Sequence, residues 1–198
     1  MKLLCLHSSP NTGGVSRGLA EYLYTHLKRN CKEASIVDLN ALDFKACQAC
    51  LRCKLFDIEG CVLNDELRDI LFRYREADIL ILASPIYAAD VNVKMKKFIE
   101  RSHCFAPTNR GPLPSTLLEP KDKRLVMILT QGKPSEYHKD IANKYEICFR
   151  NLGYKYFDFI RSCEVPSNSK FKVENYRKEL MNCQILAQKI CKRIENES

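Results

Sequence analysis

The stretch Ala77-Asp-Ile-Leu-Ile-Leu-Ala-Ser-Pro-Ile-Tyr87 decides the fold of this 198-residue chain. Its apolar run at 78–84 is continuous rather than alternating, which is typical of a strand that helices cover on both faces. The run ends at Ser84-Pro85, where a turn is expected because proline fixes the backbone and lacks an N–H donor. The stretch therefore predicts an inner strand of a parallel sheet, followed by a loop at the carboxyl end of that strand.

Strands and helices alternate on both sides of this stretch. Further strands are expected at 2–7, 34–39, 124–130 and 154–161, and helices at 16–29, 64–75, 91–105, 135–152 and 169–194. Residues 40–63 have no sustained periodicity and predict an irregular insertion after the second strand, whereas the prolines of 106–120 predict a loop. The alternation predicts a single α/β domain over 1–198 with a doubly wound parallel sheet and right-handed crossovers.

The composition excludes several classes of protein. Hydrophobic residues make up 45% of the chain and charged residues 28%, which allows a packed core and argues against global disorder. No apolar run approaches a membrane span and the first residues do not resemble a signal peptide, so a cytoplasmic protein without a membrane partner is expected. The formal charge of +8 is spread along the chain without a DNA-binding motif, which favours an anionic cofactor or substrate over nucleic acid.

In a doubly wound sheet, ligands bind beyond the carboxyl ends of the strands. Three loops lie there, at 8–16, 84–92 and 130–134. The first, Ser8-Ser-Pro-Asn-Thr-Gly-Gly-Val-Ser16, is rich in hydroxyls and glycine, so it suits an anion at a helix N-terminus. It lacks both Gly-Lys-Ser/Thr and Gly-x-Gly-x-x-Gly, which favours a phosphate monoester such as FMN over a triphosphate or a dinucleotide. A simple helix N-cap with flexible glycines is the alternative interpretation.

Three motifs together resemble one known family. They are Ser9-Pro10, the 77–87 stretch and Lys97-Phe-Ile-Glu-Arg101, and they are similar to motifs of the NADPH-dependent FMN reductase branch of the flavodoxin-like superfamily. The resemblance covers roughly 1–135. It implies a flavodoxin-like five-stranded parallel sheet in the order 2-1-3-4-5, an FMN-dependent oxidoreductase, and a homodimer or homotetramer.

The same resemblance implies the residues that bind FMN. The phosphate is expected at Ser9, Asn11 and Ser16 with the backbone of Gly14 and Val15, and the isoalloxazine at Pro85, Ile86, Tyr87, Asn92, Thr130, Gln131 and Gly132. Asn11 stands where the family usually has arginine, and Val15 where it often has asparagine. Phosphate binding is therefore expected to depend on Ser9, Ser16, Arg17 and main-chain donors.

Four of the eleven cysteines crowd together as Cys47-x2-Cys50-x2-Cys53-x7-Cys61. The first three match the spacing of a ferredoxin-type run, although the fourth is farther along and no proline follows it. The pattern resembles the compact cysteine motif of the iron–sulfur flavoproteins of this family, which implies a [4Fe–4S] cluster. A tetrathiolate zinc site, or no metal, remains the alternative because four cysteines alone do not select the metal. The odd total argues against a disulfide scaffold, and the other seven cysteines are expected in the core.

These observations predict an iron–sulfur flavoprotein that passes electrons between a two-electron flavin and a one-electron cluster. A ferredoxin-like or small-molecule redox partner is expected, and NAD(P)H is a candidate electron donor. Two alternatives remain open: an NAD(P)H-dependent FMN or quinone reductase without a cluster, and a non-catalytic flavodoxin-like electron carrier. No catalytic acid–base residue is expected, since FMN and the cluster would carry the chemistry.

Overall fold

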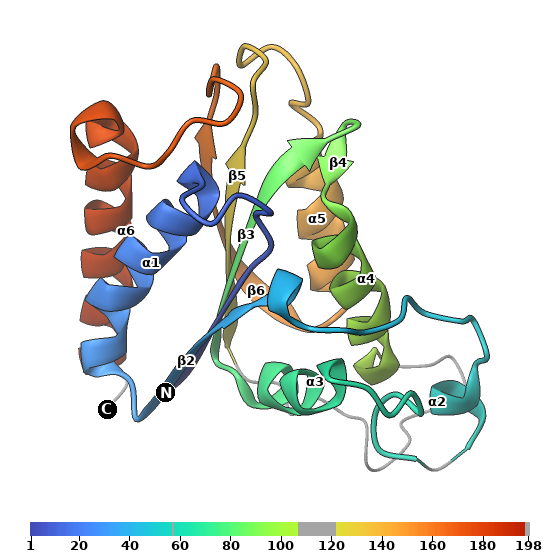
Figure 1. The fold of residues 1–198 in the computed structure, drawn as a ribbon. Coiled ribbons are helices and arrows are strands. Elements are labelled where there is room, and N and C mark those ends of the chain that lie inside the picture. The colour runs from blue at the N-terminus through green and yellow to red at the C-terminus, as the bar shows by residue number, and fades with distance from the viewer. Residues whose placement is uncertain (57, 107–121, 197–198) are drawn as a thin grey trace.

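The computed structural model describes residues 1–56, 58–106 and 122–196 (Figure 1). The loop predicted at 106–120 lies, apart from Ala106, outside the described residues. Within the described part, no helix combines the length and the apolar character needed to cross a bilayer.

One parallel sheet forms the centre of the molecule. Its five long strands are β1 (Lys2–His7), β2 (Glu33–Asp38), β3 (Ile79–Tyr87), β5 (Lys123–Thr130) and β6 (Tyr154–Ser162). They lie in the order β2-β1-β3-β5-β6, and the short β4 (Asp90–Val91) pairs antiparallel with β3. The predicted α/β parallel sheet of flavodoxin-like type is thus confirmed, with β4 as an element that the sequence did not predict.

Helices cover both faces of this sheet (Figure 1). The helices α1 (Val15–Leu27) and α6 (Arg177–Asn196) lie on one face, and α3 (Leu67–Glu76), α4 (Val93–Ser102) and α5 (Ile141–Arg150) lie on the other. The β3 side chains alternate between the two resulting cores: Ile79 and Ile81 pack with α1 and α6, and Leu80 and Leu82 pack toward α3, α4 and α5. Burial on both faces explains why the β3 sequence is apolar without a break.

Two predicted helices begin six or more residues later than the sequence indicated. Residues 135–140 form turns, with His138 at a positive φ of 56°, and α5 begins only at Ile141. The helix predicted from 169 begins at Arg177, because residues 163–171 instead fold toward the first loop, where the Phe171 N–H donates to the Gly13 carbonyl at 2.7 Å. Short 3₁₀ turns occur at Lys28–Asn30, Leu39–Ala41, His103–Phe105 and Val173–Asn175.

The segment after β2 is mostly irregular. Among its described residues, the regular structure between 42 and 66 is limited to α2 (Arg52–Leu55), which follows two residues in the left-handed region, Ala49 (φ 50°) and Leu51 (φ 54°). This segment lies beside α3 and the C-terminal end of α4, away from the carboxyl ends of the strands (Figure 1). The molecule therefore has two separate regions that could carry chemistry.

Candidate cofactor site

The first region is a pocket at the carboxyl ends of β1, β3 and β5. Eleven of the twelve predicted cofactor residues line it, and a further wall comes from 165–169. The eleven are Ser9, Asn11, Gly14, Val15, Ser16, Pro85, Ile86, Tyr87, Thr130, Gln131 and Gly132. The parallel register brings these separate loops to one edge, since β1 pairs with β3 and β3 with β5.

The loop after β1 leaves polar groups available for an anion. Gly14 is the N-cap of α1 and makes no side-chain cap, so N–H groups of the first turn of α1 have no side-chain partner. The Ser16 hydroxyl is buried and has no hydrogen-bond partner among the described residues. A buried unpaired hydroxyl beside the positive end of a helix fits a bound phosphate. The residues present therefore fit the phosphate of FMN.

Gly14 also has no room for a side chain. A Cβ on Gly14 would lie 2.4 Å from the Ser9 hydroxyl oxygen and 2.9 Å from the Asn11 carbonyl oxygen. The neighbouring Gly13 has more space, since a Cβ there would be 3.4 Å from the Lys170 side chain. Asn11 fixes the turn with its own side chain, which accepts from the Gly13 N–H at 3.1 Å. The loop is thus closed around Gly14, and the backbone there can approach a ligand closely.

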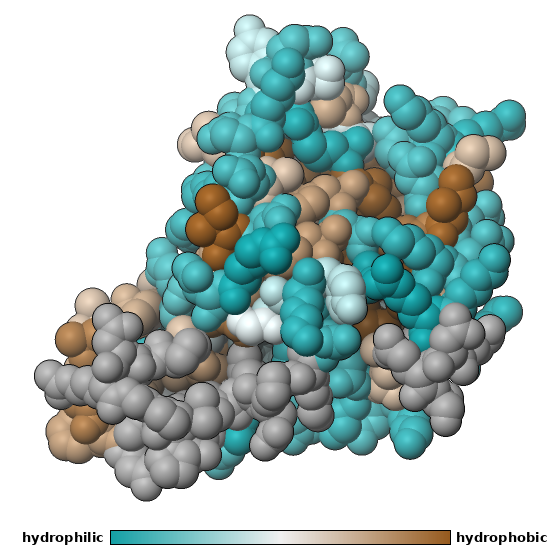
Figure 2. Space-filling view, turned by 180° about the vertical axis from the view of Figure 1, so that it is seen from behind, coloured by the Kyte–Doolittle hydropathy of each residue, from teal (hydrophilic) through white to brown (hydrophobic). Residues whose placement is uncertain are grey.

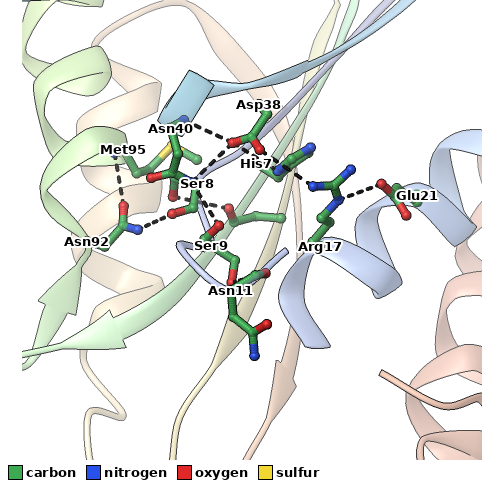
Figure 3. Close-up of polar contacts among 11 residues, drawn as sticks. His7, Ser8, Ser9, Asn11, Arg17, Glu21, Asp38, Asn40, Asn92 and Met95 are labelled. Atoms are coloured by element: carbon green, nitrogen blue, oxygen red, sulfur yellow. Dashed lines mark hydrogen bonds and ion pairs between the residues drawn. The ribbon is translucent and has the colours of Figure 1, made fainter. Parts of the chain in front are cut away.

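Two asparagines hold the carbonyl groups of this loop (Figure 3). The Asn40 amide donates to the Ser9 carbonyl at 2.8 Å, and the Asn92 amide donates to the Ser8 carbonyl. Carbonyl oxygens repel an anion. The hydrogen bonds to the Ser8 and Ser9 carbonyls reduce this repulsion and therefore favour binding of an anion at the loop. Asn92 does not line the pocket, in contrast to the prediction. Its side chain is instead the N-cap of α4 and accepts from the Met95 N–H at 3.1 Å.

Arg17 is also placed differently from the expectation that it would contact the phosphate. Its side chain extends from α1 toward Asp38 at the end of β2: its Nε donates to Glu21 at 2.8 Å and its Nη1 is 3.6 Å from Asp38 (Figure 3). Asp38 Oδ1 also lies 3.6 Å from the buried His7 Nδ1. Burial lowers the pKa of His7 and Asp38 only partly opposes this, so His7 is neutral at neutral pH. The hydroxyl side chains that line this part of the pocket are thus those of Ser9 and Ser16, beside the N–H groups of the first turn of α1.

The loop after β3 forms a strained hairpin next to the pocket. Ala88 (φ 48°) and Ala89 (φ 63°) both occupy the left-handed region, where two-residue hairpins usually have glycine or asparagine. Asp90 anchors the hairpin to α5, because it accepts from Lys144 at 2.6 Å and from the Tyr145 hydroxyl. Tyr87 remains 52% exposed and lines the pocket. Backbone strain of this kind concentrates at ligand sites.

The wall at 165–169 was absent from the predicted site. Asn11 reaches it with a bond from its Nδ2 to the Ser169 carbonyl at 3.3 Å, and Gly14 forms an isolated bridge with Lys170. The Val-Pro-Ser-Asn-Ser sequence of the wall is a strong turn signal, and this signal could have placed the segment in a loop. The sequence alone does not show that this loop folds back over α1.

The second region is a pocket at the C-terminal end of α4. All four cysteines of the predicted cluster line it, with Cys104, His103, Lys54 and Arg101 around them. Cys47 and Cys50 are exposed, and Cys53 and Cys61 are partly buried. Burial raises the pKa of the Cys53 thiol, while Lys54 opposes the shift. Four thiols fit a thiophilic metal by donor chemistry.

The ligands are not assembled for a metal, however. Among the described residues, no three side chains of Cys, His, Asp or Glu come together in a group that could hold one ion. The segment also exposes large apolar side chains, and from behind the molecule apolar surface gathers at this corner (Figure 2). These exposed side chains are Leu51, Leu55, Phe56 and Val62. The four cysteines thus share a pocket without forming a ligand group.

Known structures share this fold at low sequence identity. An NAD(P)H:quinone oxidoreductase from Methanothermobacter marburgensis superposes with a TM-score of 0.68 at 17% identity, covering 96% of both chains. An FMN-dependent NADH-azoreductase from Bacillus anthracis, solved in complex with FMN, has a TM-score of 0.69 at 15% identity, covering 96% of this chain and all of that one. These likenesses support the fold.

Sequence comparison identifies relatives and a family. An iron–sulfur flavoprotein of Archaeoglobus fulgidus is 31% identical over 102 residues, which are 52% of this chain and 49% of that protein. One from Methanosarcina thermophila is 26% identical over 102 residues, 52% of each chain. The chain thus spans about half the length of such curated relatives. Residues 1–136 match the family described as NADPH-dependent FMN reductase. The chain belongs to the NADPH-dependent FMN reductase family, as its motifs predict.

Proposed function

We propose that this chain binds FMN in the pocket at the carboxyl ends of β1, β3 and β5 and works as an oxidoreductase. The observation that carries the proposal is the meeting of eleven predicted residues in one pocket with a buried, unpaired Ser16 hydroxyl. Ser9, Ser16 and the N-terminal N–H groups of α1 would hold the phosphate, and Pro85, Ile86 and Tyr87 would border the ring. Bound FMN would supply the two-electron redox chemistry.

The finer proposal is that Cys47, Cys50, Cys53 and Cys61 hold a [4Fe–4S] cluster that exchanges single electrons with the flavin. It is supported by the shared pocket of the four thiols and by the iron–sulfur flavoproteins among the relatives. The two pockets lie at opposite ends of α4, whose ten residues span about 15 Å. In an oligomer, electrons would also have a route from the cluster of one subunit to the flavin of another. The exposed apolar side chains of the cysteine segment (residues 45–65) favour a homodimer or homotetramer.

Redox partners follow from the chemistry of the pocket and of the surface. NAD(P)H is the proposed donor, and a ferredoxin-like protein or a small molecule is the proposed acceptor. The basic chain, with its charge of +8, favours both an anionic nicotinamide cofactor and an acidic protein. A reducing cytoplasm is the compartment in which eleven free cysteines would persist.

A second candidate is an NAD(P)H-dependent FMN or quinone reductase without a cluster. The observation in its favour is that the described cysteines do not form a ready ligand group. In this case the cysteine segment would be a structural insertion, and NAD(P)H would reduce the flavin in the same pocket.

Anaerobic purification followed by an absorbance spectrum and cofactor analysis tests both proposals. The primary proposal predicts one FMN per chain, iron and acid-labile sulfide in equal amounts, and bleaching of the flavin when NADPH is mixed in. A chain with FMN but no iron supports the cluster-free reductase. A chain that neither retains FMN nor binds added FMN contradicts the flavin proposal itself.

A further inference from the structure

One buried arginine joins the two ends of the cysteine segment. Arg101 lies in the last turn of α4, and its side chain is fully buried. Its Nη1 donates to both carboxylate oxygens of Asp65, at 2.7 and 2.6 Å, and to the Lys45 carbonyl at 3.3 Å. Its Nη2 donates to the Leu63 carbonyl at 3.2 Å. The segment therefore begins and ends on one guanidinium group.

The bonds to Arg101 flank the first and the last cysteine of the segment. Lys45 precedes Cys47 by two residues, and Leu63 follows Cys61 by two residues. Asp65 strengthens the closure, since it also accepts from the backbone N–H of Lys45 at 3.1 Å and of Leu67 at 3.2 Å. The cysteines are thus carried on a loop whose ends are held together independently of any metal. Closing a loop beforehand reduces the conformational entropy that ligand assembly would cost.

Arg101 also has an unused donor. Its Nε is buried without a hydrogen-bond partner among the described residues, and Arg101 lines the cysteine pocket. A buried cation normally has all its donors paired, so an orphaned N–H at a pocket of thiols points to a missing acceptor. Of the four cysteines, Cys61 lies beside the Arg101 guanidinium. Cys61 is therefore the natural acceptor.

The other cation at the pocket is engaged elsewhere. The Lys54 ammonium donates to the backbone carbonyls of Cys104 at 3.3 Å and of Ala106. Burial lowers the pKa of Lys54, with Cys53 opposing the shift. Lys54 fixes α2 against the turn after α4, whereas Arg101, which also lines the pocket, has an Nε without a partner among the described residues.

We propose that Arg101 is a positioning residue of the cysteine pocket: it holds the ends of the segment closed before metal binding, and its Nε–H donates to the Cys61 sulfur when that thiol is deprotonated as a ligand. The thiol proton leaves to solvent on ligation, and no electron is transferred in this step. The guanidinium then offsets part of the negative charge of the metal–thiolate group. The second half of the proposal rests on the proposed cluster function, whereas the first half concerns the chain alone.

The test compares Arg101→Gln, Arg101→Lys and Asp65→Asn in the full-length chain. Arg150→Gln is the matched control, because Arg150 makes an exposed ion pair with Glu146 on α5, away from the cysteines. Circular dichroism establishes that each variant is folded. In metal-free protein, the alkylation rate of each cysteine by N-ethylmaleimide is followed by mass spectrometry. Separately, Co²⁺ binding is followed by its thiolate charge-transfer absorbance, and iron content is measured after anaerobic purification.

We expect different results for cysteine alkylation and for metal binding. Cys53 and Cys61 should be alkylated about tenfold faster in Arg101→Gln and Asp65→Asn, because the partly buried thiols become accessible when the ends separate. Co²⁺ affinity and iron content should fall by about 10- to 100-fold in Arg101→Gln, which is the usual effect of losing an outer-shell partner. Arg101→Lys retains the positive charge but not the two-pronged guanidinium group, so its loss of Co²⁺ affinity and iron content should be intermediate. Arg150→Gln should match the wild type.

Each other outcome has a defined meaning. Wild-type alkylation rates in Arg101→Gln would overturn the closure of the segment. Faster alkylation with undiminished Co²⁺ affinity would overturn the donor role toward Cys61. If the wild type binds neither Co²⁺ nor iron, the cluster proposal and the donor role fail together, while the alkylation rates still decide the closure. If Arg101→Gln does not fold, Arg101→Lys and Asp65→Asn decide both points.

Discussion

The two pockets at the ends of α4 are built in different ways. At the N-terminal end, Asn92 caps the helix and holds the Ser8 carbonyl, and three strand ends place the remaining residues. At the C-terminal end, Arg101 holds a long irregular segment at its two ends, and the cysteines between them are not in ligating positions. A pocket on strand ends is formed by folding of the sheet, whereas a pocket on a loop depends on its ligand for the final arrangement.

This difference has a thermodynamic consequence. Binding to a preformed pocket costs little ordering of the chain, so FMN affinity should depend on local contacts. Metal binding to the cysteine segment must also order the loop, so part of the binding free energy becomes local folding free energy. The two sites should therefore respond separately to substitution, and each of the following experiments tests that separation.

The largest effect is expected for Cys53→Ser. Cys53 is the third of the four ligand candidates and lies partly buried in the cysteine pocket, so its loss should remove essentially all bound iron. FMN binding should be unchanged, because the flavin pocket shares no residue with this segment. Iron, sulfide and flavin analysis of anaerobically purified protein measures both. Cys191→Ser is the control, because Cys191 is a partly buried cysteine on α6, and this variant should retain iron. Equal iron in both variants would contradict the ligand assignment.

Gly14→Val should produce the opposite result. Its side chain would overlap the Ser9 hydroxyl and the Asn11 carbonyl, so the loop must shift and FMN affinity should fall by about 100-fold or more, which corresponds to about 3 kcal/mol. Gly13→Ala has ordinary contact space and should lose less than about threefold. Quenching of flavin fluorescence measures the affinities. Iron content should stay at the wild-type level; a parallel loss of iron would show that the two pockets are coupled.

The long strands could be predicted from the sequence because their signals were local, whereas their order was implied by the family resemblance. The apolar run of β3 is continuous, as burial on both faces requires, and the hydroxyl-rich turn after β1 lies at the carboxyl edge of the sheet. Once alternating strands and helices predict a parallel sheet, the loops that face the ligand follow from topology. For this reason eleven of twelve predicted cofactor residues meet in one pocket.

Long-range contacts account for what the sequence did not predict. The wall at 165–169 is held by the bond that the Asn11 amide donates to the Ser169 carbonyl, and just after it the Phe171 N–H donates to the Gly13 carbonyl; both bonds join residues more than 150 positions apart. Asn92 matches a family position, but its side chain is used for capping α4 and for the Ser8 carbonyl. Arg101 is part of a recognised motif, yet its role depends on Asp65 and on two backbone carbonyls that no local pattern marks. Such partners become visible only in three dimensions.

A smaller effect is expected at the hairpin beside the flavin pocket. Burial opposes ionisation of Asp90, but hydrogen bonds from Lys144 and Tyr145 lower its pKa to about 2. A carboxylate with a depressed pKa in the folded state stabilises the fold above its usual pKa near 3.8, and this contribution is lost as pH falls toward 2. Asp90→Asn should therefore lower the free energy of unfolding at pH 7 by about 2 kcal/mol and reduce the loss of stability between pH 4 and 2.

Urea unfolding at pH 7, 4 and 2 measures these differences for Asp90→Asn. Asp122→Asn is the control, because Asp122 pairs with Lys155 at an exposed position and should leave the stability at pH 7 unchanged. An Asp90→Asn curve that keeps the wild-type acid dependence would show that other carboxylates govern acid unfolding.

The smallest effect should come from Asn92→Asp, and it separates the two functions of this residue. Aspartate still accepts from the Met95 N–H and remains a good N-cap, so helix α4 and the cysteine pocket should be retained. It cannot donate to the Ser8 carbonyl, and its charge lies near the loop that would bind a phosphate. FMN affinity should fall by about tenfold, or about 1.4 kcal/mol, with iron content unchanged. Asn92→Ala should also lose the N-cap of α4. Its midpoint of thermal unfolding should therefore be lower than that of Asn92→Asp, and the difference measures the contribution of the cap. Equal FMN affinity in Asn92→Asp and the wild type would mean that the Ser8 carbonyl needs no donor, and that the loop after β1 is held by Asn40 and its own turn.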